Sequence, residues 1–242
     1  MKLIKSIIKW MVVAFFASTI LAVVALRFIP VFFTPLMFIR CIEQKDEGKS
    51  LKLKHDWVSL DEMSPSMPVA VMASEDQRFL KHHGFDFNAI EKAAVHNFGS
   101  KKKRGASTIS QQTAKNVFLW PGRSWLRKGL EAYFTTLVEL MWSKQRIMEV
   151  YLNSIEMGDG IYGVEAVAQE NFGCSAKELT RANCALIAAT LPNPRKFSSK
   201  NPSEYMVKRK YSIMKQMKFI PIMPAEGQDI DPSTVDGGIY KH

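Results

Sequence analysis

The stretch GRSWLRKGLEAYFTTLVELM (122–141) carries the clearest secondary-structure pattern in this chain of 242 residues. Its apolar residues recur three and four positions apart, which predicts one buried face of a long helix. That face consists of Leu126, Leu130, Tyr133, Phe134, Leu137 and Met141. The same spacing predicts shorter helices around 147–151, 179–187 and 205–219, and no run of the sequence shows sustained alternation. The sequence therefore predicts a mainly α-helical domain.

The overall composition limits the kind of protein that the chain can form. With 47% hydrophobic and 23% charged residues, it has enough apolar side chains for a core and is not a disordered chain. Its length excludes a large multidomain enzyme. The three cysteines, Cys41, Cys174 and Cys184, form no CxxC pair, which argues against a disulfide framework or a zinc ribbon. Cys174 and Cys184 could lie close together, but a buried thiol is expected at Cys184.

The N-terminal 40 residues differ sharply from the rest, because they contain no acidic residue. The segment 10–26 has no charge at all, and its 17 residues lie at the short end of the length that spans a membrane. An uncleaved anchor is the preferred interpretation, and a cleaved signal peptide is the alternative. Lys2, Lys5 and Lys9 precede the apolar run and should remain in the cytoplasm.

The next stretch, FIPVFFTPLMFI (28–39), is apolar but contains Pro30 and Pro35. Because proline interrupts helices, a second straight membrane span is not expected here. The stretch either lies along the outer membrane surface or packs on the domain as a hydrophobic linker.

Basic residues gather in the window 92–130, which holds nine lysines and arginines and no acid. Such charges repel one another unless an anion is near, although a solvated basic face is the ordinary explanation. Their interleaving with Ser, Thr and Gln favours an anion site. For a protein tied to a bilayer, lipid phosphates are better candidates than nucleic acid. Within this window, 101–104 is expected to form a mobile loop attracted to lipid headgroups.

Two segments contain candidate site residues next to predicted helix ends. In EDQRFLKHHGFD (75–86), Glu75 follows an apolar run and is either a partly desolvated base or an ordinary helix-end glutamate. Asp86 and Ser107 are predicted N-caps, and the adjacent histidines argue against a metal site. In RGASTISQQTAKN (104–116), a helix starting near Ser107 would carry a face that binds a sugar and a phosphate, or a merely exposed polar face. The residues of that face are Thr108, Gln111, Gln112 and Lys115.

Two further segments complete the pattern. Lys128 and Glu131 are three apart on a helix, so they form either an exposed salt bridge or part of an active site with a second carboxylate. The segment KQRIMEVYLNSIEMGDGIYGVEAVAQENF (144–172) reads mostly as scaffold, with a glycine-rich loop at 158–160.

Taken together, these four segments in this order resemble the peptidoglycan glycosyltransferases, family 51 of the glycosyltransferases. The matched motifs are ED-x-x-F-x-x-H-x-G-F-D at 75–86, G-x-S-T-I-x-Q-Q-x-x-K-N at 105–116, R-K-x-x-E at 127–131, and K-x-x-I-x-x-x-Y-L-N with G-x-G-x-Y-G at 144–163. The resemblance covers about 55–195. The anchor and the stretch VFLWPGRSWLRKGLEA look like the monofunctional biosynthetic form of Gram-negative bacteria, and no Lys-Thr-Gly motif of a transpeptidase occurs.

The resemblance implies a lysozyme-like, mainly α glycosyltransferase domain with one N-terminal transmembrane helix. The expected divisions are a cytoplasmic N-terminus (1–9), a transmembrane anchor (10–29), a membrane-surface linker (30–44), the glycosyltransferase domain (45–220) and a flexible tail (221–242). The implied location is the inner membrane, with a single pass and the catalytic domain in the periplasm.

The resemblance also implies an activity, the polymerisation of lipid II. Glu75 would take the proton from the acceptor 4-hydroxyl, which attacks C1 of the donor sugar with inversion and forms a β-1,4 bond. Undecaprenyl pyrophosphate leaves, and Lys115, Arg123 and Lys128 would stabilise its charge. Glu131 would be a second catalytic carboxylate, orienting those cations or a divalent ion. The remaining substrate-binding residues would be Ser107, Thr108, Gln111, Gln112 and Asn116.

The expected partners are lipid II, the growing glycan strand and inner-membrane lipids, with cell-division proteins as candidates and no nucleic acid. No cofactor and no metal ligand are required, and a divalent cation (Mg or Mn) is left open. A glycan-cleaving enzyme of lysozyme-like fold is the first alternative, although it needs no pyrophosphate site. The second alternative is an anchored, non-catalytic binding protein that holds anionic polymer on its basic face.

Overall fold

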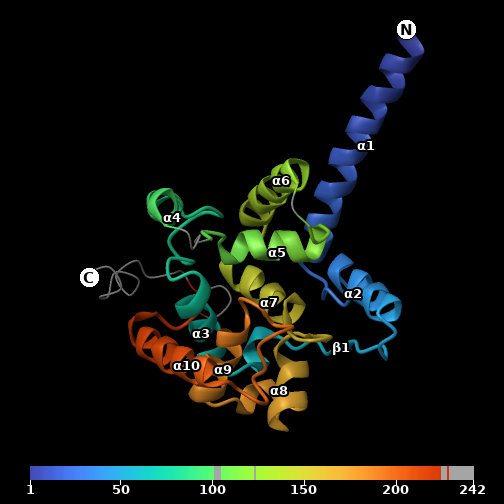
Figure 1. Ribbon diagram of the computed structural model, residues 1–242. Coiled ribbons are helices and arrows are strands. Elements are labelled where there is room, and N and C mark those ends of the chain that lie inside the picture. Colours follow the sequence, from blue (N-terminus) through green and yellow to red (C-terminus); the bar gives the residue numbers. More distant parts are fainter. Residues whose placement is uncertain (101–104, 123, 225–227, 229–242) are drawn as a thin grey trace.

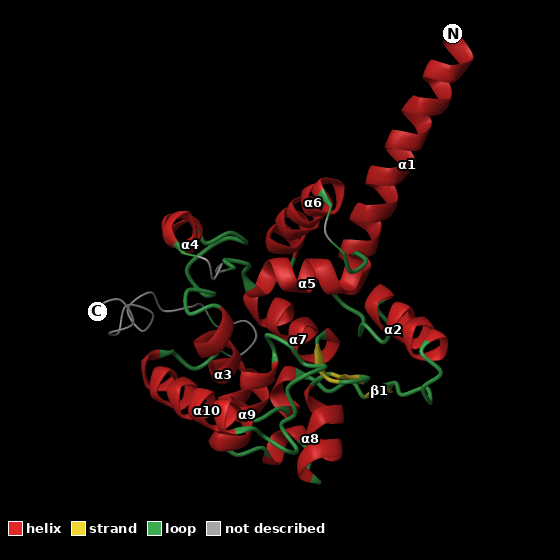
Figure 2. Ribbon diagram, in the orientation of Figure 1, coloured by secondary structure: helices red, strands yellow, loops and turns green. Residues whose placement is uncertain are grey.

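The computed structural model describes residues 1–100, 105–122, 124–224 and 228 (Figure 1). Helices dominate the described chain, and one small sheet accompanies them (Figure 2). The helices are α1 (Lys2–Leu26), α2 (Pro35–Asp46), α3 (Ser66–Glu75), α4 (Phe87–Gly99), α5 (Ile109–Phe118), α6 (Trp125–Met141), α7 (Lys144–Ser154), α8 (Val164–Phe172), α9 (Arg181–Thr190) and α10 (Glu204–Gln216). The strands are β1 (Lys54–His55), β2 (Glu156–Gly158) and β3 (Ile161–Tyr162), and short 3-10 turns lie at 60–62, 176–178 and 217–219.

Side-chain caps fix where several helices begin. Asp86 caps α4 by accepting a hydrogen bond from the backbone N–H of Ala89 at 3.0 Å, which confirms its prediction. The prediction of Ser107 as the cap of α5 is wrong, because Thr108 holds that position. Thr108 and Gln111 form a reciprocal capping box, in which the Thr108 hydroxyl accepts from the Gln111 N–H and the Gln111 side chain accepts from the Thr108 N–H. This second hydrogen bond favours Thr108 over Ser107 as the cap.

The core lies where α5 and α7 cross and where α3 packs on α9 (Figure 1). Along α7, Ile147, Val150, Tyr151 and Leu152 are fully buried, as their spacing predicted. The predicted helix around 179–187 begins later than expected, because Thr180 caps α9 and leaves the preceding leucine outside it. The strongest helix contacts thus form two sets, α5 with α6 and α7, and α9 with α3 and α10.

The long helix α6 buries most of its predicted apolar face, with Phe134 in the core and Leu130, Leu137 and Met141 packed against it, but the first residue of that face is an exception. Leu126 is 70% exposed, whereas Glu131 and Thr135 are buried. The Tyr133 hydroxyl lies 2.8 Å from the hydroxyl of Thr19, so this residue contacts α1 as well as the core. Buried polar groups are tolerated only where they have partners: Glu131 is paired with Arg127 and Lys128, and Thr135 donates to the backbone oxygen of Glu131 at 2.6 Å.

The N-terminal helix α1 projects from the domain, with its C-terminal end against α6 (Figure 1). Its 25 residues correspond to about 37 Å, longer than the roughly 30 Å hydrocarbon core of a bilayer. Within the described residues it is the one helix long and apolar enough to cross a membrane. The indole N–H of Trp142 donates to the backbone oxygen of Val23 at 2.8 Å, and Arg146 donates to that of Leu26 at 2.9 Å. The domain therefore satisfies carbonyls at the end of the anchor.

The predicted linker contains helix α2, which packs by one face only. Met37 is buried against the domain, and the Gln44 amide bonds both backbone groups of Lys52, at 2.8 and 3.2 Å. Phe38 and Ile42 on the other face are more than half exposed. The packed-linker alternative is therefore confirmed for one face, and contact of the other face with a membrane surface stays a prediction.

The small sheet was not expected from the sequence. Strand β3 lies between β1, which is parallel to it, and β2, which is antiparallel to it. The predicted glycine-rich loop supplies the turn between β2 and β3. Gly160 has a φ of +66°, and a Cβ there would lie 2.3 Å from the backbone oxygen of Lys52. Strands of two or three residues are too short to show alternation, which explains why the pattern missed them.

The remaining predictions concern the C-terminal tail and the cysteines. Met223, within the predicted flexible tail, is buried in the core, so the first part of this segment is packed. Residues 225–227 and 229–242 lie outside the described residues. The three cysteines are free, and burial raises the pKa of the Cys184 thiol to about 12, as expected for a buried thiol.

We expect Asn153→Ala to destabilise the fold strongly. The fully buried Asn153 side chain bonds the N–H and the oxygen of Val58, at 3.0 and 2.9 Å, and the oxygen of Glu149 at 2.9 Å. Alanine leaves these groups unpaired, so the free energy of unfolding should fall by about 2–4 kcal/mol. Urea unfolding measures the change. The exposed Asn201→Ala is the control, and equal stability of both variants would contradict the prediction.

Candidate active site

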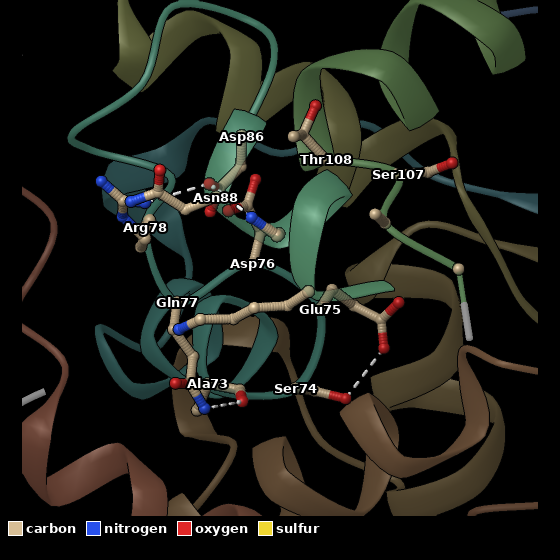
Figure 3. A pocket seen from close by; sticks show the side chains of 14 residues that line it. Ala73, Ser74, Glu75, Asp76, Gln77, Arg78, Asp86, Asn88, Ser107 and Thr108 are labelled. Atoms are coloured by element: carbon tan, nitrogen blue, oxygen red, sulfur yellow. Dashed lines mark hydrogen bonds and ion pairs between the residues drawn. The ribbon is translucent and has the colours of Figure 1, made fainter. Parts of the chain in front are cut away.

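Glu75 is the last residue of α3, and its side chain is 16% exposed. The Ser74 hydroxyl donates to its Oε1 at 2.9 Å (Figure 3). The Gln112 amide makes a long contact with its Oε2 at 3.5 Å. Arg209 of α10 lies 3.8 Å from Oε1. The carboxylate is thus oriented by neighbours from three helices and still reached by solvent. A general base requires this combination of fixed orientation and access.

The neighbouring Asp76 points in a different direction and has a structural role (Figure 3). Its buried carboxylate accepts hydrogen bonds from the backbone N–H of Ile109 at 3.0 Å and from His82 Nε2 at 2.9 Å. Gly84 completes the turn with a φ of +87°, and a Cβ there would lie 2.9 Å from Thr135 Cγ2. Asp76 therefore fixes the end of α3 to the start of α5.

A first cavity of about 290 Å³ opens beside Glu75, between the end of α3, the start of α4 and the segment before α5 (Figure 3). Its lining includes Arg78, Asp86, Lys92 and Ser107. Arg78 and Asp86 form an ion pair at 3.1 Å on its wall. Polar side chains around an open cavity suit a ligand rich in hydroxyl groups, such as a sugar.

The predicted polar face of α5 has two roles, because some of its residues cap the helix and others line a cavity. Thr108 donates to the backbone oxygen of Gly84 at 2.6 Å and accepts from the N–H of Gln111 at 3.2 Å. Gln111 accepts from the N–H of Thr108 at 3.0 Å and lines neither this cavity nor the next. These two side chains stabilise the helix start. Gln112 and Lys115, one turn on, face a second cavity.

The second cavity has a volume of about 550 Å³ and lies between α2, α5, α6 and the segment 191–194. Its described lining carries four cations and two carboxylates: Arg40, Lys115, Arg127, Lys128, Glu131 and Glu156. Its apolar lining includes Leu36, Leu119, Trp120, Ile155, Leu191 and Pro192, and its polar lining includes Ser107, Gln112 and the buried Asn116. Net positive charge beside apolar side chains suits an anionic lipid.

Glu131 organises the cations of this cavity. The residue is only 3% exposed. Its carboxylate accepts a hydrogen bond from Arg127 Nη1 at 2.8 Å and forms an ion pair with Lys128. The prediction of an exposed salt bridge is wrong, because the neighbouring helices cover the carboxylate. Both oxygens are engaged by cations, so Glu131 holds two positive charges at the cavity wall.

Burial lowers the pKa of Lys115 below its ordinary value of 10.5. The nearby positive charges of Arg127 and Lys128 lower this pKa further, and Glu131 opposes the shift. A bound anion would favour the charged ammonium and relieve this repulsion. Because Lys115 also lines the second cavity, an anion bound there would stabilise its charged form.

The two cavities adjoin, because Ser107 lines both of them. Gln112 lines the second cavity and contacts Glu75 beside the first. The predicted Glu75, Lys115 and Glu131 thus share one cleft. The predicted Arg123, and the loop 101–104, lie outside the described residues.

Several residues of the site were missed by the sequence analysis. Arg209 reaches Ser74 at 3.1 Å from a helix more than 130 residues away, and no local pattern indicates this. The buried Tyr151 was interpreted as core only, yet its hydroxyl donates to Gln112 at 3.1 Å. Lys144, whose pKa is lowered by burial, donates to the backbone oxygen of His82 at 2.6 Å, in the segment that follows Glu75. These contacts join distant segments and depend on the tertiary structure.

The described part of the chain contains no group of three or more His, Cys, Asp or Glu side chains arranged to hold a metal ion. His82 is bonded to Asp76, and both oxygens of Glu131 face cations. These carboxylates position other residues.

Comparisons with known proteins agree with this geometry. The transglycosylase family model matches residues 44–218, close to the predicted domain 45–220. A biosynthetic peptidoglycan transglycosylase of Bacteroides thetaiotaomicron is 58% identical, over 91% of this chain and 90% of its own. Proteins of the same name from Bdellovibrio bacteriovorus and Caulobacter vibrioides are 52% and 50% identical, over 94% and 88% of this chain and 90% and 91% of theirs. The chain therefore belongs to the transglycosylase family, which confirms the expected glycosyltransferase and its lysozyme-like, mainly helical fold.

Proposed function

We propose that this protein is a peptidoglycan glycosyltransferase that polymerises lipid II and has no transpeptidase activity. The observation that carries the proposal is the shared cleft, in which a fixed carboxylate, Glu75, adjoins a cavity rich in cations. A glycan-cleaving enzyme needs the carboxylate but not the cations. The relatives' name, biosynthetic peptidoglycan transglycosylase, supports the same direction of reaction.

In the proposed reaction, Glu75 removes the proton from the acceptor 4-hydroxyl as its oxygen attacks C1 of the donor sugar. The bond from C1 to the pyrophosphate oxygen breaks, and undecaprenyl pyrophosphate leaves with the bonding electron pair. A single displacement inverts the α-linked donor to a β-1,4 product. Ser74 and Gln112 support this role by orienting the carboxylate.

The second cavity stabilises the charge of the leaving group. Lys115 and Lys128 are proposed to contact the pyrophosphate, with Arg127 beside them and Glu131 holding the array together. Ser107, Gln112 and Asn116 line the same cavity and are proposed to bind sugar and phosphate oxygens. Arg123 is retained in the proposal on its motif alone. The caps Thr108 and Gln111 act indirectly, by fixing the start of α5.

The membrane arrangement follows from the chain's N-terminal charges. Lys2, Lys5 and Lys9 precede the apolar run, so the proposed orientation has the N-terminus in the cytoplasm and the domain in the periplasm, at the inner membrane. Holding enzyme and lipid substrate on one surface raises their effective concentration. A divalent cation is not required by the proposed steps, and polymerisation in the presence of a chelator tests its contribution.

The test supplies two substrates to the full-length protein in detergent. Radiolabelled lipid II and finished glycan strands are incubated separately, and the products are separated on a gel. The proposal expects lipid II to be converted to long strands and the glycan to remain intact. Cleavage of the glycan without consumption of lipid II would establish the cleaving enzyme, and salt-sensitive binding without either reaction would establish the binding protein.

We expect kcat/KM for lipid II to fall on the alkaline side at a pH below that of an ordinary lysine. The protonated Lys115 binds the anion, and its lowered pKa means that this charge is lost earlier as pH rises. Lys115→Arg keeps its charge over the whole range, so it should move the alkaline limb to higher pH. A pH profile of both proteins measures the shift. Identical limbs would remove Lys115 from the phosphate site.

A further inference from the structure

The helix that leads from the membrane anchor, α2, forms one wall of the second cavity. Leu36 and Arg40, one turn apart on α2, both line it. The cavity is therefore not complete within the domain's own helices α5 and α6. A ligand that fills it meets the linker as well as the catalytic domain.

Arg40 is held at this wall by carboxylates on two sides. Its Nη1 donates to Glu43 at 2.5 Å, and its Nε lies 3.5 Å from Oε2 of Glu156 on strand β2. The Arg40 side chain is 21% exposed, so it is neither fully buried nor free in solvent. The contacts with Glu43 and Glu156 engage Nη1 and Nε, and the side chain also lines the cavity.

The surroundings of Arg40 contain buried polar atoms that lack partners. Glu156 is 5% exposed, and its Oε1 forms no hydrogen bond with any described residue. The same holds for Nε of Arg40 and for the hydroxyl of the buried Tyr162. Burial raises the pKa of Glu156 despite the neighbouring arginine. Arg40 and Glu156 both line the second cavity, so this incompletely paired cluster lies at the wall that a ligand would contact.

The cavity's chemistry defines that ligand. Glu131 already engages Arg127 and Lys128, whereas Arg40 and Lys115 face the cavity from opposite elements, α2 and α5. Apolar side chains, Leu36 and Trp120 among them, line the same space. Two separate cationic groups next to an apolar surface match a diphosphate joined to a prenyl chain.

We propose that Arg40 contacts the diphosphate of the prenyl-linked donor, so that the membrane-side helix α2 belongs to the substrate-binding site. This inference rests on the proposed function for the identity of the donor. Glu156 acts as a positioning residue, which holds Arg40 at the wall and partly offsets its charge while the site is empty. Because Glu156 opposes an incoming anion, the pair has opposite effects on anion binding.

Because Arg40 and Glu156 should affect anion binding in opposite directions, their variants can distinguish a role in ligand binding from a purely structural role. Binding of farnesyl diphosphate and farnesyl monophosphate to the full-length protein in detergent is measured by calorimetry. Arg40→Gln should weaken diphosphate binding about tenfold, and monophosphate binding less. Glu156→Gln should strengthen diphosphate binding about threefold, because Arg40 keeps its charge without the opposing carboxylate. Arg40→Lys should be intermediate, because lysine keeps the charge but not the planar fork.

Arg195→Gln is the matched control. Arg195 also lies near Glu43, at 3.5 Å, but does not line the cavity, so diphosphate affinity should not change. If Arg40→Gln and Glu156→Gln both weaken binding, or Arg40→Gln has no effect, the pair is only structural and the inference is wrong. If Arg40→Gln does not fold, Glu156→Gln and Arg40→Lys decide. Polymerisation of lipid II by the wild type is assayed separately, so failure of the proposed function is distinguished from failure of this inference.

Discussion

Glu75→Gln is expected to abolish strand polymerisation while leaving lipid II binding intact. The amide has the size of the carboxylate and can still accept a hydrogen bond from Ser74, so the local structure is retained. It cannot take the proton of the attacking hydroxyl. Loss of a general base typically costs about 10²–10⁴-fold in rate. Single-turnover assays with labelled lipid II measure the rate, and filter binding or calorimetry measures the affinity.

Glu170→Gln is the control for this experiment. Glu170 lies on α8, 3.4 Å from Lys54, and lines neither cavity of the cleft. Its substitution should leave the polymerisation rate unchanged. Near wild-type activity of Glu75→Gln would show that another group accepts the proton, and equal losses in both variants would indicate a general effect on folding.

Lys115→Ala is expected to have the second largest effect, a fall in kcat/KM of about 10²–10³-fold, the loss typical for removal of one group that stabilises developing charge in a buried site. Lys115 is half-buried at the cavity wall, where the low dielectric strengthens its attraction to a pyrophosphate. Steady-state kinetics with lipid II measure the change. Binding of farnesyl diphosphate should weaken in parallel.

Lys177→Ala provides the comparison, because Lys177 is exposed and remote from the cleft. It should change neither kinetics nor affinity beyond the small effects usual for surface substitutions. Unchanged diphosphate binding in Lys115→Ala would place the leaving group elsewhere in the cleft. Reduced kcat with unchanged KM would indicate that Lys115 acts only in the transition state.

The sequence was sufficient for several of the helices and for the motifs that carry the candidate site. Helix α7 was predicted because apolar spacing of three and four positions is a local property of the chain. Asp86 was predicted as a cap because a cap bonds a backbone group only three residues away. Glu75 and Lys115 were identified through motifs, whose residues lie within a dozen positions of one another.

The tertiary structure determined which candidate side chains are buried and which residues surround them. The sequence left Glu131 as either an exposed salt bridge or an active-site carboxylate, and packing of α5 on α6 buries it. Arg209 reaches Ser74 only because α10 returns to α3. Arg40 faces the cavity only because α2 packs on α5.

The spacing of apolar residues along one helix can thus be predicted from the sequence, because it depends on the geometry of that helix alone. The sequence alone determined a helical transglycosylase with an apolar N-terminal helix and a glutamate at a helix end. The contacts of Glu75, the burial of Glu131 and the closure of the cavity by α2 were decided by packing between segments far apart in the chain. Such contacts depend on how side chains from the whole fold pack together, and a local sequence pattern carries no information about that packing.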